Sequence, residues 1–528
     1  MKIGIAQINT SAGNLDYNLQ KIGQSIQTLG KENDVVVFPE MAISGAPLYD
    51  QNNQESFVLR QQEILQKIQD IALKTSENLK VIIGYIDIQG GEENQYSNAA
   101  AVIGKDIQIY HKQNLPNKGI KNEPRYFAPG TENLLFTFWE NLKGALTIWE
   151  DITNPNILQS LQQEKADAVF NISSTFFEWE SASDKLQKTR DIQKKLDSTY
   201  VQVNQVGGEG GIIFDGMSTI IDKNGNLLNE SQRFQESLQS VDTENETSDF
   251  SSSLDQREEY QEVLETMKLA LKDYLEKRNI SDVVIWVSGG LDSAVDLYVA
   301  SQVLPPERIH AIYMPTKFNA NESLQLSQTL TNNLGIELKI WEIQSLLEGY
   351  ERFSDKVFEK SLQGVSHENI QARIRGNILM NLANDKKALV INNSNKTELA
   401  LGYGTLYGDL IGGLALLGDL NKKRVYELSN YINKDQELIP QGIIQRKASA
   451  ELSDGQVDPF DYERISEPVD ELLFGAEVNK VSEKYGIPLD ELQQLQNRIE
   501  RARFKGEQIP AVVKLTKNTI NQGTKFPY

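Results

Sequence analysis

The stretch DVVIWVSGGLDSAVDL, residues 282–297, decides the fold of the second half of the chain. It opens with a run of β-branched and apolar residues, which is typical of a buried parallel strand, and it continues into a helical pattern. A strand, a glycine turn and a helix in this order predict a βα unit whose helix N-terminus faces an anion. The residues at the turn are Ser288, Gly289, Gly290, Leu291, Asp292 and Ser293.

The composition of this turn favours phosphate as the anion. Two glycines let backbone amides approach a ligand without a Cβ in the way, and Ser288 and Ser293 add hydroxyl donors. Asp292 is unexpected there, because a carboxylate repels phosphate unless a cation lies between them, so the turn predicts Mg²⁺. A Gly-Gly turn alone is often only a tight structural turn, but the longer string Ser-Gly-Gly-x-Asp-Ser is more specific. No Gly-Lys-Ser/Thr follows, so the turn is not a Walker A loop.

The surrounding sequence predicts an α/β protein of two domains joined by a linker. Short β-rich runs alternate with helical stretches over residues 1–240 and again over residues 260–528. Between them, residues 241–259 are polar and rich in Ser, Asp and Glu, which indicates an acidic linker. A chain of 528 residues is also too long for one hydrophobic core.

Composition excludes several functions. The formal net charge of −21 argues against nucleic acid or an anionic membrane as the partner. The chain has no cysteine, so it cannot use a thiol nucleophile, and its three histidines are far apart, which disfavours a histidine zinc site. No apolar run is long enough to span a membrane, and the N-terminus reads as a core strand rather than a signal peptide, so we expect a cytoplasmic protein.

The turn at residues 288–293 resembles the PP-loop of ATP pyrophosphatases, which cut ATP to AMP and pyrophosphate. Four further stretches of the second half are ENIQARIRGNILM (368–380), NSNKTELALGYGTLYGDLIGG (393–413), RKASAEL (446–452) and RFKGEQIP (503–510), and together they resemble NAD synthetase. In the first half, FPEMAISG, YHKQNLPN, RYFAPG and NQVGGEGGIIFDG resemble the nitrilase-type glutamine amidase that is fused to it. The resemblance implies a nitrilase-like α/β sandwich followed by a Rossmann-like, doubly wound PP-loop domain.

The resemblance implies ATP-dependent amidation of deamido-NAD through an acyl-adenylate, with AMP as the leaving group for ammonia. Asp292 and Glu398 match the pair that holds Mg²⁺, and Glu398 also belongs to the deamido-NAD site. By pattern alone, Glu398 equally reads as the charged start of a helix. Residues that match further ATP contacts are Met314, Asn393, Lys422 and Ser449, with Asn393 in place of the usual Thr. Residues that match deamido-NAD contacts are Asn369, Arg373 and Lys505.

The amidase half departs from its family at one position. Glu40 and Lys112 match the base and the oxyanion-stabilising lysine, but Trp149 stands in GALTIWED (144–151) where the family has its cysteine. An indole has no nucleophile at neutral pH. Neighbours differ too: Lys121 and Asn122 replace the usual Phe-Asp before a retained Glu123.

We therefore expect a synthetase that uses free ammonia, joined to an amidase-like domain without a nucleophile, in a homo-oligomer. Three alternatives stay open: a hydroxyl that rescues glutamine use, another PP-loop adenylating ligase, and a non-catalytic nucleotide-binding scaffold. The hydroxyl candidates are Thr147, Ser173, Ser174 and Thr175.

Overall fold

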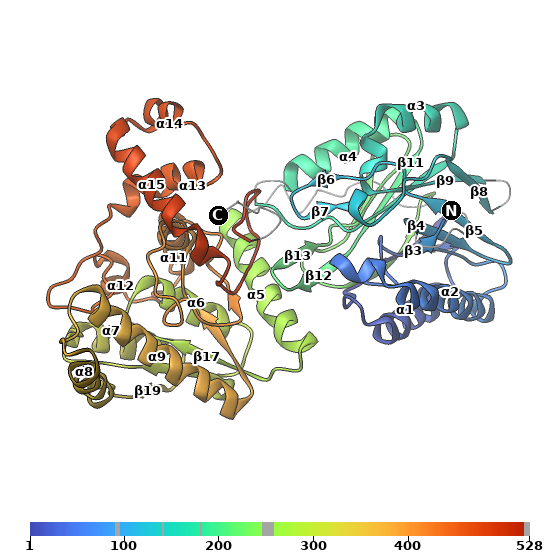
Figure 1. Ribbon diagram of the computed structural model, residues 1–528. Helices are drawn as coiled ribbons and strands as arrows, with labels where there is room; N and C mark the ends of the chain where they lie inside the picture. Colours follow the sequence, from blue (N-terminus) through green and yellow to red (C-terminus); the bar gives the residue numbers. More distant parts are fainter. Residues whose placement is uncertain (90–94, 140–141, 180–181, 245–257, 522–528) are drawn as a thin grey trace. The chain divides into compact units, whose positions relative to one another are not determined.

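The computed structural model describes residues 1–89, 95–139, 142–179, 182–244 and 258–521. The chain divides into two compact units, Met1–Glu262 and Val263–Tyr528, and each is described by itself (Figure 1). Within the described ranges, no helix combines the length and the apolar character needed to cross a membrane.

The first unit contains two six-stranded sheets. One has the order β16-β1-β2-β3-β4-β5 and the other β15-β14-β11-β10-β9-β8. In each sheet three central strands are parallel and the outer pairings are antiparallel. The strands of the first sheet are β1 (Lys2–Gln7), β2 (Val35–Val37), β3 (Lys80–Ile88), β4 (Tyr96–Ile103), β5 (Ile107–His111) and β16 (Ser237–Asp242). Those of the second are β8 (Leu134–Trp139), β9 (Leu142–Ile148), β10 (Ala168–Ser173), β11 (Thr199–Asn204), β14 (Thr219–Ile221) and β15 (Leu227–Glu230).

Side-chain alternation builds the layers of this unit. Along β1, Ile3 and Ile5 pack into the core between the two sheets, whereas Ala6 packs against helices α1 (Leu15–Leu29) and α2 (Glu55–Thr75). On the outer side of the second sheet, Ala145 and Val169 pack with residues of α3 (Pro155–Glu164) and α4 (Ala182–Leu196). The result is a four-layer α-β-β-α sandwich, in agreement with the fold expected for residues 1–240.

The start of the expected linker is wrong. Val241 and Asp242 are the end of β16, which pairs with the whole length of β1. Their backbone groups complete an edge of the sheet, and this pairing overrides their polar surroundings in sequence. At the other end of the expected linker, Glu259 begins helix α5 (Glu259–Lys277). Most of the remaining linker, residues 245–257, lies outside the described residues.

The second unit is organised around a six-stranded sheet in which all pairings are parallel, with the order β19-β18-β17-β20-β21-β22. Numbered along the chain this is 3-2-1-4-5-6, the order of a doubly wound sheet. The order reverses between β17 and β20, and a ligand is expected beyond the carboxyl ends of these two strands. The strands are β17 (Asp282–Trp286), β18 (Ile309–Tyr313), β19 (Leu338–Ile340), β20 (Ala388–Asn392), β21 (Leu414–Ala415) and β22 (Ala511–Val512).

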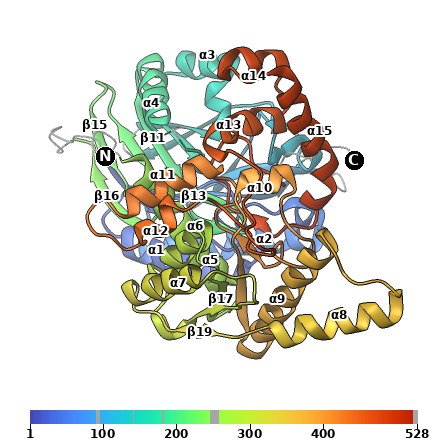
Figure 2. The same ribbon diagram turned by 90° about the vertical axis from the view of Figure 1, so that its left-hand side faces the viewer.

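Helices cover this sheet and extend beyond it. Val284 and Val390 share a core with α9 (Val365–Lys386) and α8 (Gln344–Phe358), while α6 (Leu291–Ser301) packs on β17 as well. A second core unites α10 (Lys396–Leu401) with α13 (Tyr462–Leu473), α14 (Val478–Tyr485) and α15 (Leu489–Gly506). Figures 1 and 2 both show α13, α14 and α15 together, on the side of the unit away from α8. Three further helices of this unit are α7 (Asn321–Asn333), α11 (Lys422–Ile432) and α12 (Gln441–Gln445).

Candidate active site

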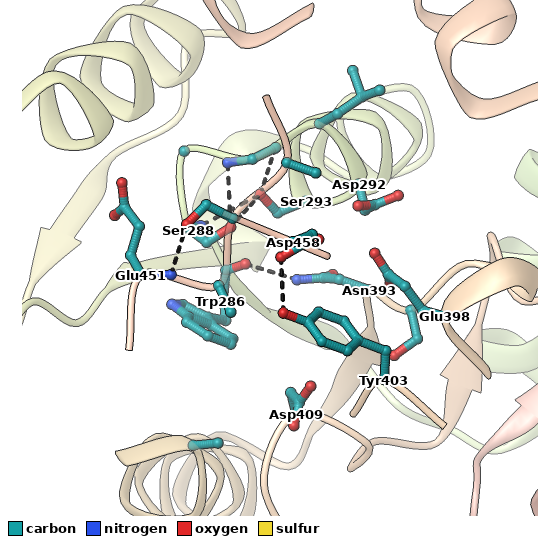
Figure 3. Close-up of a pocket in the computed structure, with 18 of the residues that line it drawn as sticks. Trp286, Ser288, Asp292, Ser293, Asn393, Glu398, Tyr403, Asp409, Glu451 and Asp458 are labelled. Atoms are coloured by element: carbon teal, nitrogen blue, oxygen red, sulfur yellow. Dashed lines mark hydrogen bonds between the residues drawn. The ribbon is translucent and has the colours of Figure 1, made fainter. Parts of the chain in front are cut away.

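A cavity of about 180 Å³ lies at the point where the strand order of the second sheet reverses (Figure 3). It is lined by the turn after β17, by the segment after β20 and by residues 446–452. Ten of the predicted site residues line it together: Ser288, Gly289, Gly290, Leu291, Asp292, Ser293, Asn393, Glu398, Lys422 and Ser449.

The turn after β17 has the shape of an anion-binding loop. The hydroxyl of Ser288 accepts a hydrogen bond from Gly290 N–H at 3.2 Å, and the hydroxyl of Ser293 donates to the Gly290 carbonyl at 3.0 Å. Gly289 has φ +80°, and a Cβ there would lie 2.7 Å from the Ser323 carbonyl oxygen, so only glycine fits. The turn leads into the N-terminus of α6, whose free N–H groups favour a negatively charged ligand.

Acidic side chains converge beside this loop. Lys422 forms ion pairs with both Asp292 and Glu398, the latter at 3.3 Å. Burial, followed by the charges of Asp292 and Asp458, raises the pKa of Glu398 to about 8 although Lys422 opposes the shift. The pKa of Lys422 is raised, because the two carboxylates outweigh its burial. This part of the pocket therefore places three carboxyl groups, those of Asp292, Glu398 and Asp458, near one ammonium group, that of Lys422.

This donor set suits a divalent cation. Carboxylate oxygens are the ligands that Mg²⁺ prefers, and the raised pKa of Glu398 marks a carboxylate that lacks full compensation. Within the described part of the chain, no group of three or more His, Cys, Asp or Glu side chains has the arrangement of a metal site. Asp292 and Glu398 can thus supply part of a coordination sphere, and the other ligands have to come from water or from phosphate oxygens.

Asn393 and Glu398 are held by local hydrogen bonds. Asn393 Nδ2 donates to the carbonyl of Trp286 at 2.8 Å, which ties the segment after β20 to the end of β17. Asn395 caps α10 by accepting from Glu398 N–H, and its Nδ2 donates to Asp292 Oδ1 at 3.1 Å. Both readings of Glu398 are therefore compatible: it starts a capped helix and also faces the cavity.

Of the residues expected to hold deamido-NAD, only Glu398 lines this cavity, whereas Asn369, Arg373 and Lys505 gather around one neighbouring segment, residues 402–406. Asn369 Oδ1 accepts from the Thr405 hydroxyl at 2.8 Å, and Arg373 Nε donates to the carbonyl of Leu406 at 3.2 Å. Lys505 Nζ donates to the carbonyls of Gly402 and Gly404 at 2.8 and 2.7 Å. Met314 is also absent from the lining; it is buried, and its carbonyl accepts from Arg375 Nε at 3.0 Å.

Several lining residues escaped the sequence analysis. Tyr403 donates its hydroxyl to Asp458 Oδ1 at 3.0 Å, and the guanidinium of buried Arg375 lies 5.2 Å from the ring centroid of Trp286. Tyr403 and Arg375 lie inside the stretches 393–413 and 368–380 that carry the resemblance, so these stretches could have pointed to both residues. Trp286 lies in the quoted stretch 282–297 but was taken only as a strand residue, and Asp458 lies in none of the quoted stretches.

The first unit holds a second, smaller cavity of about 90 Å³. Glu40 Oε1 accepts from Lys112 Nζ and from Asn98 Nδ2, both at 2.8 Å, and Glu40 Oε2 accepts from Ser174 N–H at 2.8 Å. Lys112 also donates to Glu123 at 2.9 Å. The charge of Lys112 outweighs burial and lowers the pKa of Glu40 to about 2, so this carboxylate is fully ionised at neutral pH.

Trp149 lies beside the Glu40–Lys112 pair, as the resemblance implies. Its ring centroid is 5.1 Å from Lys112 Nζ and 3.0 Å from Lys121 Nζ. Its φ of +41° is in the left-handed region, which is strained for a bulky residue and which clusters at functional sites. Two residues after Trp149, the buried carboxylate of Asp151 accepts hydrogen bonds from the N–H groups of Gln113 at 3.0 Å and of Asn114 at 2.7 Å. These bonds fix the chain near Trp149 to the segment at residues 113–114.

Comparisons with known proteins agree with these two units. The Carbon-nitrogen hydrolase family matches residues 2–249 and the NAD synthase family matches residues 263–509. A glutamine-dependent NAD(+) synthetase of Acinetobacter baylyi is 31% identical over 87% of this chain and 84% of its own, and one of Thermotoga maritima is 30% identical over 100% and 98%. A solved structure from Acinetobacter baumannii, in complex with ADP, has a TM-score of 0.79 at 28% identity and covers 100% of this chain and 98% of that one.

A nitrilase-like unit followed by a doubly wound synthase unit defines a two-domain carbon–nitrogen ligase, and the expected fold class is confirmed. The chain belongs to the family of glutamine-dependent NAD(+) synthetases. Its NAD synthetase function is thereby supported, while the source of nitrogen is a separate question.

Proposed function

We propose that this protein makes NAD by amidating deamido-NAD at the expense of ATP, and that it takes free ammonia rather than glutamine. The observation that carries the first part is the single cavity that unites the phosphate loop, Lys422 and the Asp292–Glu398 pair. The observation that carries the second part is Trp149, which lies against Lys112 in a chain without cysteine.

In this proposal the chain's own groups position ATP and absorb its charge. The amides of Gly289 and Gly290 and the N-terminus of α6 face the departing pyrophosphate, and Lys422 lies where it can contact phosphate oxygens. A bound Mg²⁺ would screen the phosphates from Asp292 and Glu398, which are the residues placed to hold it. ATP activates the nicotinate carboxylate as an acyl-adenylate, and ammonia then displaces AMP.

Deamido-NAD is proposed to bind next to segment 402–406. Asn369, Arg373 and Lys505 all contact that segment, and the charge of Arg373 acts on the Lys505 amine. Two cationic side chains at one place suit a dinucleotide with two phosphates. Assembly into a homo-oligomer stays a prediction, which sedimentation velocity tests directly.

The alternative of a rescued glutaminase has little support in the contacts. Among the hydroxyl candidates Ser174 lines the smaller cavity, but its hydroxyl donates to the Glu40 carbonyl at 2.8 Å, and Glu40 itself is held by three donors. A carboxylate with a pKa lowered to about 2, whose oxygens already accept hydrogen bonds, is a weak base and activates an alcohol poorly.

One assay separates the possibilities. Purified protein is given deamido-NAD, Mg-ATP and either ammonium chloride or ammonia-free glutamine, and NAD, AMP and pyrophosphate are quantified. We expect equal amounts of all three products with ammonium and background with glutamine. Glutamine-supported turnover would overturn the ammonia proposal; pyrophosphate without NAD would indicate another adenylating ligase, and no products at all a binding scaffold.

A further inference from the structure

Lys121 is a partly buried lysine that the proposed reaction does not use. It lies in the short strand β7 (Lys121–Asn122), where its Nζ rests on the Trp149 ring and donates to the Ser174 carbonyl at 3.1 Å. The same side chain lines the cavity of about 90 Å³ in the first unit. Its side chain therefore forms part of the wall of a concave site.

The cavity combines an apolar wall with unsatisfied polar atoms. Buried polar atoms are normally paired. Yet three acceptors of residues that line this cavity have no hydrogen-bond partner within the described parts of the chain: Asn52 Oδ1, Asn98 Oδ1 and Glu123 Oε2. Their presence around one space points to a ligand that carries O–H or N–H donors. The apolar lining includes Leu48, Phe127, Phe176, Ile212 and Phe214.

The electrostatic surroundings make Lys121 a good nucleophile. Burial lowers the pKa of Lys121 to about 8, and the neighbouring ammonium of Lys112 adds to this, while the carboxylates of Glu40, Glu123 and Glu150 oppose it. A desolvated lysine beside another cation is the arrangement that produces reactive amines. At pH 7.5 the fraction of neutral amine is then about two orders of magnitude above that of an ordinary lysine.

We propose that Lys121 forms a reversible imine with a small hydroxyaldehyde that binds in this cavity. The amine nitrogen attacks the carbonyl carbon, the C–O bond breaks, and the carbonyl oxygen leaves as water with the two protons of the amine. No oxidant or reductant is needed. Glu123 lines the same cavity and has one unpartnered oxygen, so we assign it the transfer of the proton from nitrogen to oxygen.

The size of the cavity limits the ligand. The cavity of about 90 Å³ accommodates a small organic molecule, and glycolaldehyde is the smallest hydroxyaldehyde. Its hydroxyl group satisfies a free acceptor, and its carbon chain contacts the aromatic wall.

Reductive trapping tests the proposal on the unmodified full-length chain. The protein is incubated with glycolaldehyde and sodium cyanoborohydride at pH 7.5, and labelled lysines are located and quantified by peptide mass mapping. We expect Lys121 to be labelled at least ten times faster than Lys105 or Lys480, whose side chains are 64% and 73% exposed. The rate at Lys121 should rise with pH to a midpoint near 8.

Variants and competition complete the test. Lys121→Arg keeps the cation on the indole but removes the nucleophile, so the fast label should disappear while ammonia-dependent NAD synthesis continues. Ethylene glycol, which offers hydroxyls without a carbonyl, should slow labelling at Lys121 alone. If Lys121 is labelled no faster than Lys105 in the wild-type chain, the proposal is wrong whatever the variants do, and the proposed NAD synthesis is unaffected by that outcome.

Discussion

Lys121 Nζ lies 3.0 Å from the centre of the Trp149 ring, so the position expected for a nucleophile carries an indole with an ammonium group on its face. Lys112 approaches the same ring at 5.1 Å. Two cations around one aromatic ring form a favourable arrangement in a desolvated place. The substitution at 149 and the substitution at 121 are thus structurally coupled.

This coupling predicts the chemistry of a restored thiol. In Trp149→Cys the thiol would lie beside two ammonium groups, which favour the thiolate, so its pKa should fall at least one unit below the usual value of about 8.5. The pH dependence of alkylation by iodoacetamide, followed by mass spectrometry, measures it. Thr147→Cys, at a buried position of β9 two residues earlier, is the matched control and should have a raised pKa. Equal midpoints for the two thiols would contradict the coupling.

A matched pair of lysines tests the nucleotide site. Lys422→Met should lower kcat/KM for ATP at least 100-fold, about 3 kcal/mol of transition-state stabilisation, because it removes the cation between Asp292 and Glu398. Lys423→Met removes the same charge one residue later, where the side chain is 36% exposed and pairs with Glu467, and should change kcat/KM less than two-fold. Similar losses in both variants would show that Lys422 acts only through net charge.

Glu398 makes cation binding depend on pH. Since its pKa is raised to about 8, the carboxyl is largely protonated at pH 7, and a divalent cation has to displace that proton. The affinity for Mg-ATP should therefore increase as pH rises from 7 to 9, with close to one proton released at pH 7. Calorimetry in buffers of different ionisation enthalpy counts the proton. Glu398→Gln should release none, and an unchanged proton count in that variant would assign the release elsewhere.

Asp296 lowers the stability of the second unit. It is fully buried in α6, its two carboxylate oxygens have no hydrogen-bond partner within the described residues, and burial together with the charge of Asp292 raises its pKa well above the usual value. A group whose pKa is raised by folding costs stability increasingly as pH rises above its unfolded value of about 3.9. Asp296→Asn should therefore stabilise the protein by about 1–3 kcal/mol at pH 8 and by less at pH 5.

Denaturant unfolding of both forms at the two pH values measures this difference. Asp16→Asn, on the exposed first turn of α1, is the control and should change the free energy of unfolding by less than about 0.5 kcal/mol. A destabilised Asp296→Asn at pH 8 would mean that the ionised carboxylate has a function in the fold.

The local sequence was sufficient to predict those parts of the site whose geometry one short segment determines. The turn at 288–293 could be predicted from its own glycines and the helix that follows it, and in the structure it follows β17 and leads into α6. Asp458 could not be found in that way, since its place beside Tyr403 and Glu398 depends on the packing of α10 and α13. The strand β16 was missed because its partner β1 lies more than two hundred residues earlier in the chain.

The sequence also predicted which residues of the amidase half come together, but not what they do there. Glu40, Lys112 and Trp149 meet as their motifs imply. The exchange at Lys121 was visible in the sequence, whereas its contact with the indole required the fold. A cation and an aromatic ring separated in sequence by a helical turn and the two strands β8 and β9 give no local pattern.

The hydrogen bonds of Asp151 have a consequence for how such an enzyme can change over time. Its carboxylate fastens the backbone of residues 113–114 to the end of β9, independently of what side chain stands at 149. The fold around a reactive side chain can therefore persist after that side chain has been replaced. A lineage supplied with ammonia could lose its thiol in one step, keep a properly folded domain, and leave an empty chamber open to new chemistry.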